Sequence, residues 1–117
     1  MLKYGIVGSR RRKDRKNIEK AVNCLPQGST VVSGGCRGVD TWAEQAAKKK
    51  GLEVQIFKPD FTGCRSYWDR VNAYYSRNKR IAELSDIIIA FVSDDRKGGT
   101  ENTIKHARKL GKEIIIK

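Results

Sequence analysis

The sequence is poor in the residues that build metal centres and disulfide frameworks. Its 117 residues include one histidine and three cysteines. Cys24, Cys36 and Cys64 are odd in number and widely spaced, and no CxxC pair occurs. We therefore expect no zinc site, no thioredoxin-like motif and no bound cofactor. Reduced thiols are typical of the cytoplasm, where we expect the protein to reside.

Long apolar runs are also missing. No segment approaches the ~20 apolar residues that a membrane-spanning helix needs. The start, Met1–Tyr4, lacks the basic and apolar regions of a secretory signal. The chain is long enough for one compact domain and too short for two. Its content of 38% hydrophobic residues is enough to form a buried core. We expect residues 1–117 to form a single domain with no membrane partner.

Acidic residues are few compared with basic ones. There are 13 Asp and Glu against 25 Lys and Arg, which gives a formal net charge of +12. A field of this size favours phosphate-bearing partners, whether nucleotides or nucleic acid. A lysine-rich surface that serves only solubility, or a thermophile's charge enrichment, would give the same count. Net charge alone leaves these alternatives open.

Short apolar segments alternate with amphipathic segments along the chain. The predicted strands are Tyr4–Val7, Thr30–Val32, Leu52–Phe57, Asp86–Val92 and Glu113–Ile116. The predicted helices are one with Ile18, Ala21 and Val22 on its apolar face, ended by Pro26 and Gly28, and then Thr41–Lys50, Trp68–Leu84 and Thr100–Leu110. This alternation predicts an α/β fold, a Rossmann-like three-layer domain with a five-stranded parallel sheet. We expect the strand order 3-2-1-4-5 with right-handed crossovers.

Three glycine turns follow three of these strands. The segment Thr30–Asp40, TVVSGGCRGVD, predicts a strand, a tight turn and the start of a helix. Glycines allow positive φ and close approach to a ligand, and a helix N-terminus attracts anions. Gly8-Ser9-Arg10 and Gly98-Gly99-Thr100 occupy equivalent places after the first and fourth strands. Because ligands bind beyond the carboxyl ends of parallel strands, the three loops should converge on one rim.

A basic run lies on the long predicted helix. Arg77 and Arg80 of RNKR share a helical face, and arginine can hold a phosphate through two parallel hydrogen bonds. Asn78 offers a donor and an acceptor to a base or ribose. The alternative for an isolated run of this kind is a solvated helical face.

These motifs resemble a known superfamily. SGGCRGVD, RNKRIAELSD and GGTENTIKHARKLGKEI are similar in sequence and order to the SLOG superfamily of Rossmann-like domains. The chain resembles the Rossmann-like domain of DNA-processing protein A and the small phage and bacterial SLOG proteins of the YspA type. The resemblance implies a pocket for a phosphate-bearing ligand. Its residues would be Gly8, Ser9, Arg10, Ser33, Gly34, Gly35, Gly38, Arg77, Asn78, Gly98, Gly99 and Thr100.

The same superfamily includes an enzyme class, the lonely-guy phosphoribohydrolases, which cleave nucleoside monophosphates at the N-glycosidic bond. Their motif places a catalytic Glu three residues after the Thr of the last glycine loop, and this chain has Thr103 there. Asp40, Glu44 and Glu101 remain candidate acids, with helix capping or a surface role as the alternative for each. Whether the protein is an enzyme stays open.

An aromatic segment, Phe61–Tyr75, gives a second indication. Bases stack on Tyr and Trp, and Arg65 and Arg70 could contact a nucleic-acid backbone. The helical spacing of Trp68 and Tyr75 favours a different interpretation, in which both pack in the core.

Three functions follow, in this order of preference. The first is binding of a nucleotide or ribose-phosphate ligand at the rim of the sheet. The second is a single-stranded nucleic-acid-binding module, and the third is a nucleoside-phosphate N-glycosidase. The resemblance also implies a homodimer.

Overall fold

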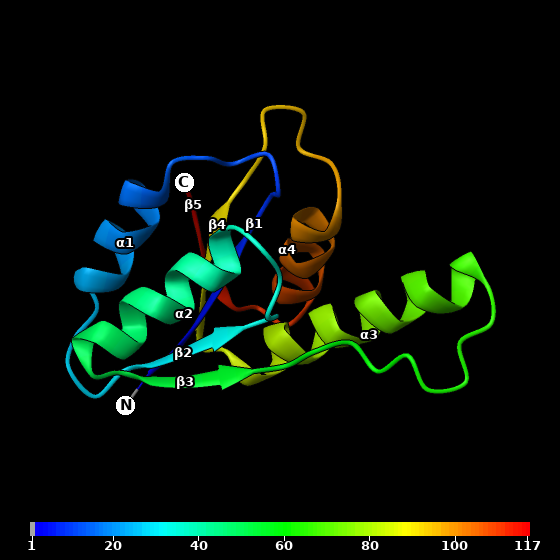
Figure 1. Cartoon of the computed structure of the whole chain (residues 1–117), viewed down its shortest axis with the longest axis horizontal. Coiled ribbons are helices and arrows are strands. Elements are labelled where there is room, and N and C mark those ends of the chain that lie inside the picture. The colour runs from blue at the N-terminus through cyan, green and yellow to red at the C-terminus, as the bar shows by residue number, and fades with distance from the viewer. Residues whose placement is uncertain (1) are drawn as a thin grey trace.

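The computed structural model describes residues 2–117 and contains a five-stranded parallel sheet (Figure 1). The strands are β1 (Lys3–Gly8), β2 (Thr30–Ser33), β3 (Glu53–Ile56), β4 (Ile87–Phe91) and β5 (Glu113–Ile116). They lie in the order β3-β2-β1-β4-β5, so the predicted strand order is confirmed. The carboxyl ends of β1, β2 and β4 therefore meet where the chain reverses its direction of winding.

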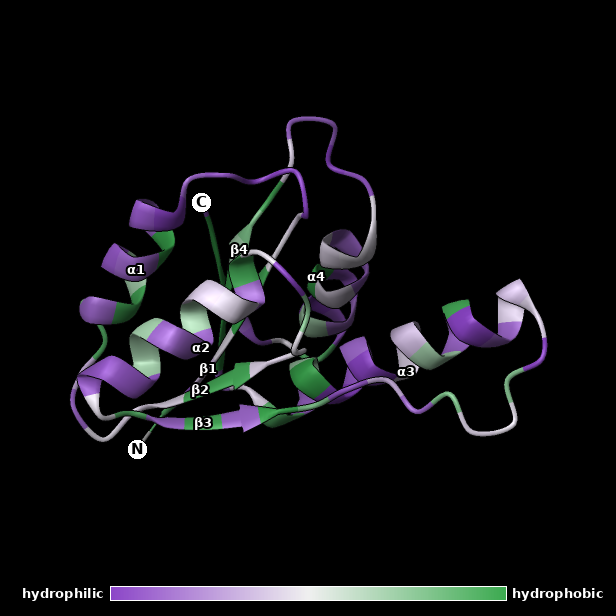
Figure 2. Ribbon diagram, viewed as in Figure 1, coloured by the Kyte–Doolittle hydropathy of each residue, from purple (hydrophilic) through white to green (hydrophobic). Residues whose placement is uncertain are grey.

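Four helices cover the two faces of the sheet. They are α1 (Arg15–Asn23), α2 (Val39–Lys50), α3 (Tyr67–Leu84) and α4 (Gly99–Lys109). Helices α1 and α2 pack against a core that includes Ile6, Val31 and Phe91. Helices α3 and α4 cover the opposite face, where Val32, Ile88 and other residues form a second core. Hydrophobic residues run along β2 and β4, and hydrophilic residues fill the loops before α1 and α4 (Figure 2).

The helix boundaries follow local signals. Ser66 and Asp69 form a capping box in which each side chain accepts a hydrogen bond from the other residue's backbone N–H, and this fixes the start of α3. Gly51 ends α2 with φ of 84°, a left-handed conformation that glycine adopts without strain. The predicted starts of α2, α3 and α4 shift by one or two residues. Helices α2 and α4 begin directly after the glycines Gly38 and Gly98, and α3 begins after its cap residue Ser66.

The first half of α3 extends past the edge of the sheet (Figure 1). Its buried residues, Arg77, Asn78, Ile81 and Ala82, all lie in the second half. The prediction that Trp68 and Tyr75 are core residues is wrong, since their exposed fractions are 69% and 46%. Helical spacing identifies a shared face, but the sheet ends before it can cover that face.

Two further searches of the chain gave negative results. The helices within residues 2–117 are too short or too polar to cross a bilayer. In the same residues, no group of three or more His, Cys, Asp or Glu side chains is placed to hold a metal ion.

Candidate functional site

A cavity of about 740 Å³ opens at the carboxyl ends of the strands. It is lined by residues of the loops after β1, β2 and β4 and by residues of α3. The predicted site residues that line it are Gly8, Ser9, Arg10, Gly34, Arg77, Asn78, Gly98, Gly99 and Thr100. The structure therefore brings at least one residue of every predicted glycine loop to one cavity.

Three predicted residues lie behind the lining. Ser33 is fully buried and its hydroxyl donates to the carboxylate of Glu44 at 2.7 Å. Gly35 and Gly38 have φ of 71° and 85°, so they shape the turn between β2 and α2. Their role in this structure is to position Gly34 and the start of α2.

Arg77 and Asn78 form a buried link between two of the loops. Arg77 Nη1 donates to the Gly34 carbonyl at 2.6 Å, and its Nε donates to Asn78 Oδ1 at 3.0 Å. Asn78 Nδ2 donates to the Gly99 carbonyl at 3.3 Å and to Asn102 Oδ1 at 3.2 Å. These side chains are not part of a solvated face, since 9% of Arg77 and 5% of Asn78 are exposed. The pair fixes the loop after β2 against the start of α4.

Gly34 is a glycine because the link passes directly beside it. A Cβ at this position would lie 2.6 Å from Arg77 Nη1 and 3.0 Å from Asp40 Oδ2. Real Cβ atoms do not approach other atoms at the first of these distances. The absence of a side chain lets the guanidinium of Arg77 reach the Gly34 carbonyl.

The third loop leads into the N-terminus of α4. Gly98 is the N-cap residue with φ of 104°, and it has no side chain that could accept from the first-turn N–H groups. Gly99 and Thr100 line the cavity, so these N–H groups and the positive end of the helix dipole lie at its wall. Such a terminus is suited to a phosphate oxygen.

Asp40 is the buried acid of the cavity. Its Oδ2 accepts a hydrogen bond from the Cys36 backbone N–H at 3.1 Å, across the start of α2. Burial raises the pKa of Asp40 to about 6, while the Cys36 hydrogen bond and the charge of Arg77 partly oppose this rise. A neutral Asp40 below this pH would reduce repulsion of an anion in the cavity.

The free energy of unfolding should depend on pH through Asp40. A rise in pKa from 3.8 to about 6 corresponds to roughly 3 kcal/mol. Because the folded state holds the proton more tightly than the unfolded state, stability falls as pH rises from about 4 to about 6. We expect Asp40→Asn, which keeps an acceptor for Cys36, to lose this fall. Urea unfolding from pH 4 to 7 measures it, and identical profiles for the two proteins would contradict it.

Glu101 and Glu44 lie outside the lining of the cavity. Both carboxylate oxygens of Glu101 accept from Arg96, at 2.8 Å and 3.0 Å. Thr103 lines the cavity, is buried, and donates its hydroxyl to the Gly99 carbonyl at 3.3 Å. Of the three candidate acids, the structure therefore places Asp40 alone against the cavity, together with the exposed Asp95.

The wall formed by α3 is aromatic, although the sequence analysis preferred to place Trp68 and Tyr75 in the core. Tyr67, Trp68, Tyr74 and Tyr75 line the cavity. Tyr67 and Trp68 are 64% and 69% exposed, and their rings meet edge to face with centroids 5.2 Å apart. The sequence carries a signal for this exposure in two adjacent aromatic pairs, Tyr67-Trp68 and Tyr74-Tyr75. Neighbouring residues on a helix cannot all face one core, so some of these rings must be exposed.

Basic side chains border the same opening. Arg10, Arg11 and Lys97 come from the loops after β1 and β4. Arg11 Nη1 donates to Asp95 Oδ2 at 2.7 Å and joins these two loops. Both partners are solvent-exposed, so the ion pair contributes little to stability and the arginine can exchange to another anion.

The strand order and the glycine loops at the rim define a Rossmann-like α/β protein. The family model described as DNA recombination-mediator protein A matches residues 1–60, about half of the sequence. The chain belongs to this family.

A solved structure supports the fold. The chain is similar to the X-ray structure of DNA processing protein A (DprA) from Streptococcus pneumoniae, with a TM-score of 0.81 and 20% identity. The alignment covers 99% of this chain and 50% of that chain, so this chain spans half the length of that relative. A weaker similarity, to AtPrR2 in its apo form, has a TM-score of 0.46 and 13% identity over 99% of this chain and 38% of that one. No curated protein matches the sequence.

Proposed function

We propose that this protein binds a phosphate-bearing nucleotide at the carboxyl rim of its sheet. The observation that carries the proposal is the meeting of three glycine loops at one cavity. The N-terminus of α4 would receive the phosphate, and Arg10 and Arg11 would neutralise its charge. We further propose that residues 1–117 act together as one binding unit.

The shape of the cavity is suited to a whole nucleotide. Its volume of about 740 Å³ lies within the range of small-molecule sites, roughly 300–1,000 Å³. A base can lie against the aromatic wall of α3 while the phosphate lies at the loops on the opposite side. The hydroxyls of Ser9 and Thr100 offer hydrogen bonds between these ends.

Calorimetry with a panel of nucleoside monophosphates, nucleosides and ribose 5-phosphate tests the proposal. We expect phosphorylated ligands to bind and the matching nucleosides to bind at least tenfold more weakly. Arg10→Ala should weaken binding of the phosphorylated ligands, and Lys49→Ala on α2 serves as the matched charge control. A folded sample that binds none of the ligands would refute the proposal.

Single-stranded nucleic acid is the second candidate ligand. The observation that favours it is the exposure of Tyr67, Trp68 and Tyr75 beside the glycine loops. Exposed aromatic rings next to a basic groove are typical of proteins that stack successive bases. The net charge of +12 and membership of a DNA recombination-mediator family agree with this candidate.

Tryptophan fluorescence should report this binding directly. The chain has two tryptophans, Trp42 on α2 and Trp68 on α3. In Trp42→Phe the remaining Trp68 should be quenched by a short oligothymidylate, whereas in Trp68→Phe the remaining Trp42 should not change. Trp68→Ala should weaken binding by about 10- to 100-fold, because stacking contributes ~1–3 kcal/mol per base.

The salt dependence separates the two candidates. Contact with several phosphates gives a steep loss of affinity with salt, whereas one nucleotide gives a shallow one. Unchanged Trp68 fluorescence at saturating oligonucleotide, or salt-independent binding, would remove the second candidate and leave the first intact.

A further inference from the structure

The buried carboxyl group of Asp40 is not used by the phosphate site proposed for this cavity. Asp40 is in the first turn of α2 and lines the cavity, although only 8% of it is exposed. Its Oδ2 accepts from the Cys36 backbone N–H, whereas residues 2–117 give its Oδ1 no hydrogen bond from a nitrogen or oxygen donor. Those residues contain no fully buried side-chain oxygen that lacks a partner, so Oδ1 is open to the cavity.

The groups around Asp40 compensate its buried charge only in part. Burial raises the pKa of Asp40 to about 6, and Glu44, one turn further along α2, raises it too. Hydrogen bonds from Cys36 and the charge of Arg77 on α3 oppose this rise. A donor that a ligand places against Oδ1 would therefore offset part of the free energy that burial of this carboxyl group costs.

Asp40 lies between the two ends of the cavity. The aromatic wall is at one end, and the N-terminus of α4 is at the other. Arg77 lies between them, since its guanidinium is 5.6 Å from the centroid of the Tyr74 ring and is linked through the next residue to the Gly99 carbonyl. Asp40 is beside this arginine, because both contact the place that a Cβ on Gly34 would take. The sugar of a nucleotide has the same intermediate position, between base and phosphate.

The hydrogen-bond donors in this middle part are already used within the protein. Arg77 donates to the Gly34 carbonyl and to the side chain of Asn78, and Asn78 donates to the Gly99 carbonyl. The Oδ1 atom of Asp40 is therefore a free acceptor in a region whose nitrogen donors have partners. An acceptor selects a ligand group that carries a hydrogen atom, such as a hydroxyl, and repels a phosphate oxygen.

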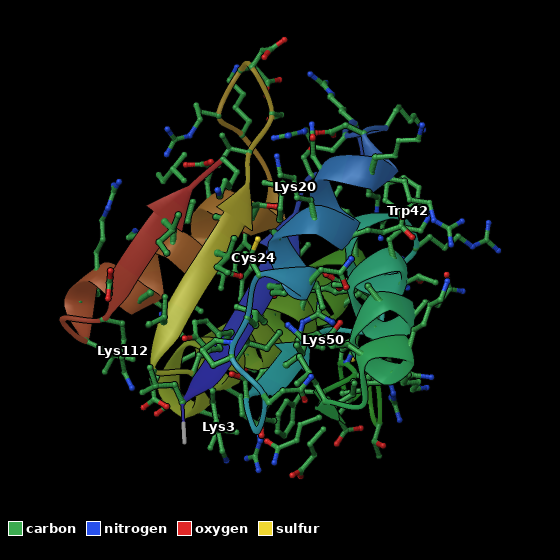
Figure 3. The ribbon with its side chains drawn as sticks, turned by 90° about the vertical axis from the view of Figure 1, so that its left-hand side faces the viewer. Lys3, Lys20, Cys24, Trp42, Lys50 and Lys112 are labelled. Carbon is green, nitrogen blue, oxygen red and sulfur yellow. The ribbon has the colours of Figure 1, made fainter. Side chains whose placement is uncertain are left out.

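Helix α2 holds Asp40 in a fixed place. It lies beside α1, and Lys50 in its last turn donates to the carbonyls of Asn23 and Leu25 at the end of α1 (Figure 3). At the other end of α2, the hydrogen bond from Cys36 orients the Asp40 side chain. A side chain held in this way on a helix can discriminate between ligands that differ in one group.

We propose that Asp40 binds a ribose hydroxyl of the nucleotide through Oδ1. The hydroxyl donates and the carboxyl oxygen accepts. This inference rests on the nucleotide binding proposed for the cavity, and it adds the class of ligand, a nucleotide whose ribose hydroxyls are free. An internal nucleotide of a DNA strand has no free hydroxyl on its sugar, so Asp40 favours a single ribonucleotide over such a strand.

Calorimetry with two pairs of ligands tests the proposal. Adenosine and cytidine monophosphate are each compared with the dideoxy form, which has the same base and phosphate but lacks both sugar hydroxyls. We expect the wild type to bind the dideoxy forms at least tenfold more weakly, because a missing hydroxyl leaves a buried acceptor without its donor. Equal affinities within each pair would overturn this inference and leave the proposed function intact. A folded wild type that binds none of the four ligands would overturn both.

Variants of α2 test whether Asp40 is the residue that holds the hydroxyl. Asp40→Ala should lower the affinity for the ribonucleotides to that for the dideoxy forms, whose own affinity should not fall. Asp40→Asn, which keeps an acceptor for Cys36, should lower the ratio of the two affinities at least threefold. Glu44→Gln is the matched control, since it removes a negative charge from the same helix outside the cavity lining, and it should keep the wild-type ratio. A purely structural role would weaken both forms alike, so a wild-type ratio in the Asp40 variants would overturn the proposal.

Discussion

Arg77→Ala should lower the free energy of unfolding by about 3 kcal/mol, an estimate based on the loss of charged hydrogen bonds that leaves buried acceptors unpaired. Arg77 donates to the carbonyls of Gly34 and Phe57 and to the side chain of Asn78. With the guanidinium gone, the Gly34 carbonyl is buried without its partner and the turn after β2 loses its support. Denaturant unfolding measures the change.

Arg80→Ala is the matched control for this prediction. Arg80 lies on the same helix, is exposed, and stacks its guanidinium over Phe57 at 5.4 Å from the ring centroid. Such an exposed contact contributes ~0.5–1 kcal/mol. If the two variants lost equal stability, Arg77 would not be the link between the loops that the structure describes.

Gly8→Ala should also lower the free energy of unfolding by about 3 kcal/mol, because the added methyl group overpacks a tightly packed site. A Cβ on Gly8 would lie 2.5–2.7 Å from three carbons of the Val39 side chain. Val39 is 1% exposed and begins α2, so relief of the clash would push α2 away from β1. The loop after β1 and the start of α2 would then both move at the rim.

Gly99→Ala provides the comparison, because it lies in another glycine loop of the same cavity. The nearest atom to its added Cβ is Asn78 Nδ2 at 3.7 Å, an ordinary contact. Gly99 is also the first residue of α4, where Ala is accepted. We expect Gly99→Ala to fold with nearly wild-type stability. A Gly8→Ala protein of the same stability as Gly99→Ala would contradict the close packing at Gly8.

The order of the elements could be predicted from the sequence because each strand and helix has its own local signal. Asp86–Val92 is an apolar run too short for a helix, and it forms the buried strand β4. The glycine turns mark the points where strands lead into helices. The strand order 3-2-1-4-5 is one of the common orders of doubly wound sheets, and the rule of right-handed connections alone does not select it.

The detailed site could not be predicted, because it depends on distances between separate elements. A basic run on a helix gives no sign that Arg77 reaches a carbonyl 43 residues earlier in the chain. Nor does helical spacing reveal that α3 extends beyond the edge of the sheet and leaves Trp68 exposed. Ser33 lies in a turn whose sequence is typical of a ligand-binding loop. Its hydroxyl nevertheless donates a hydrogen bond to the carboxylate of Glu44. Tertiary packing decided each of these outcomes.

The central proposal is that three loops receive one phosphate-bearing ligand. Backbone amide chemical shifts, followed during titration with a nucleoside monophosphate, test it most directly. We expect the amides of Ser9, Gly34 and Thr100 to shift together along one saturation curve, while the amides of α1 stay unchanged. Shifts confined to one loop, or located away from the rim, would contradict the shared site.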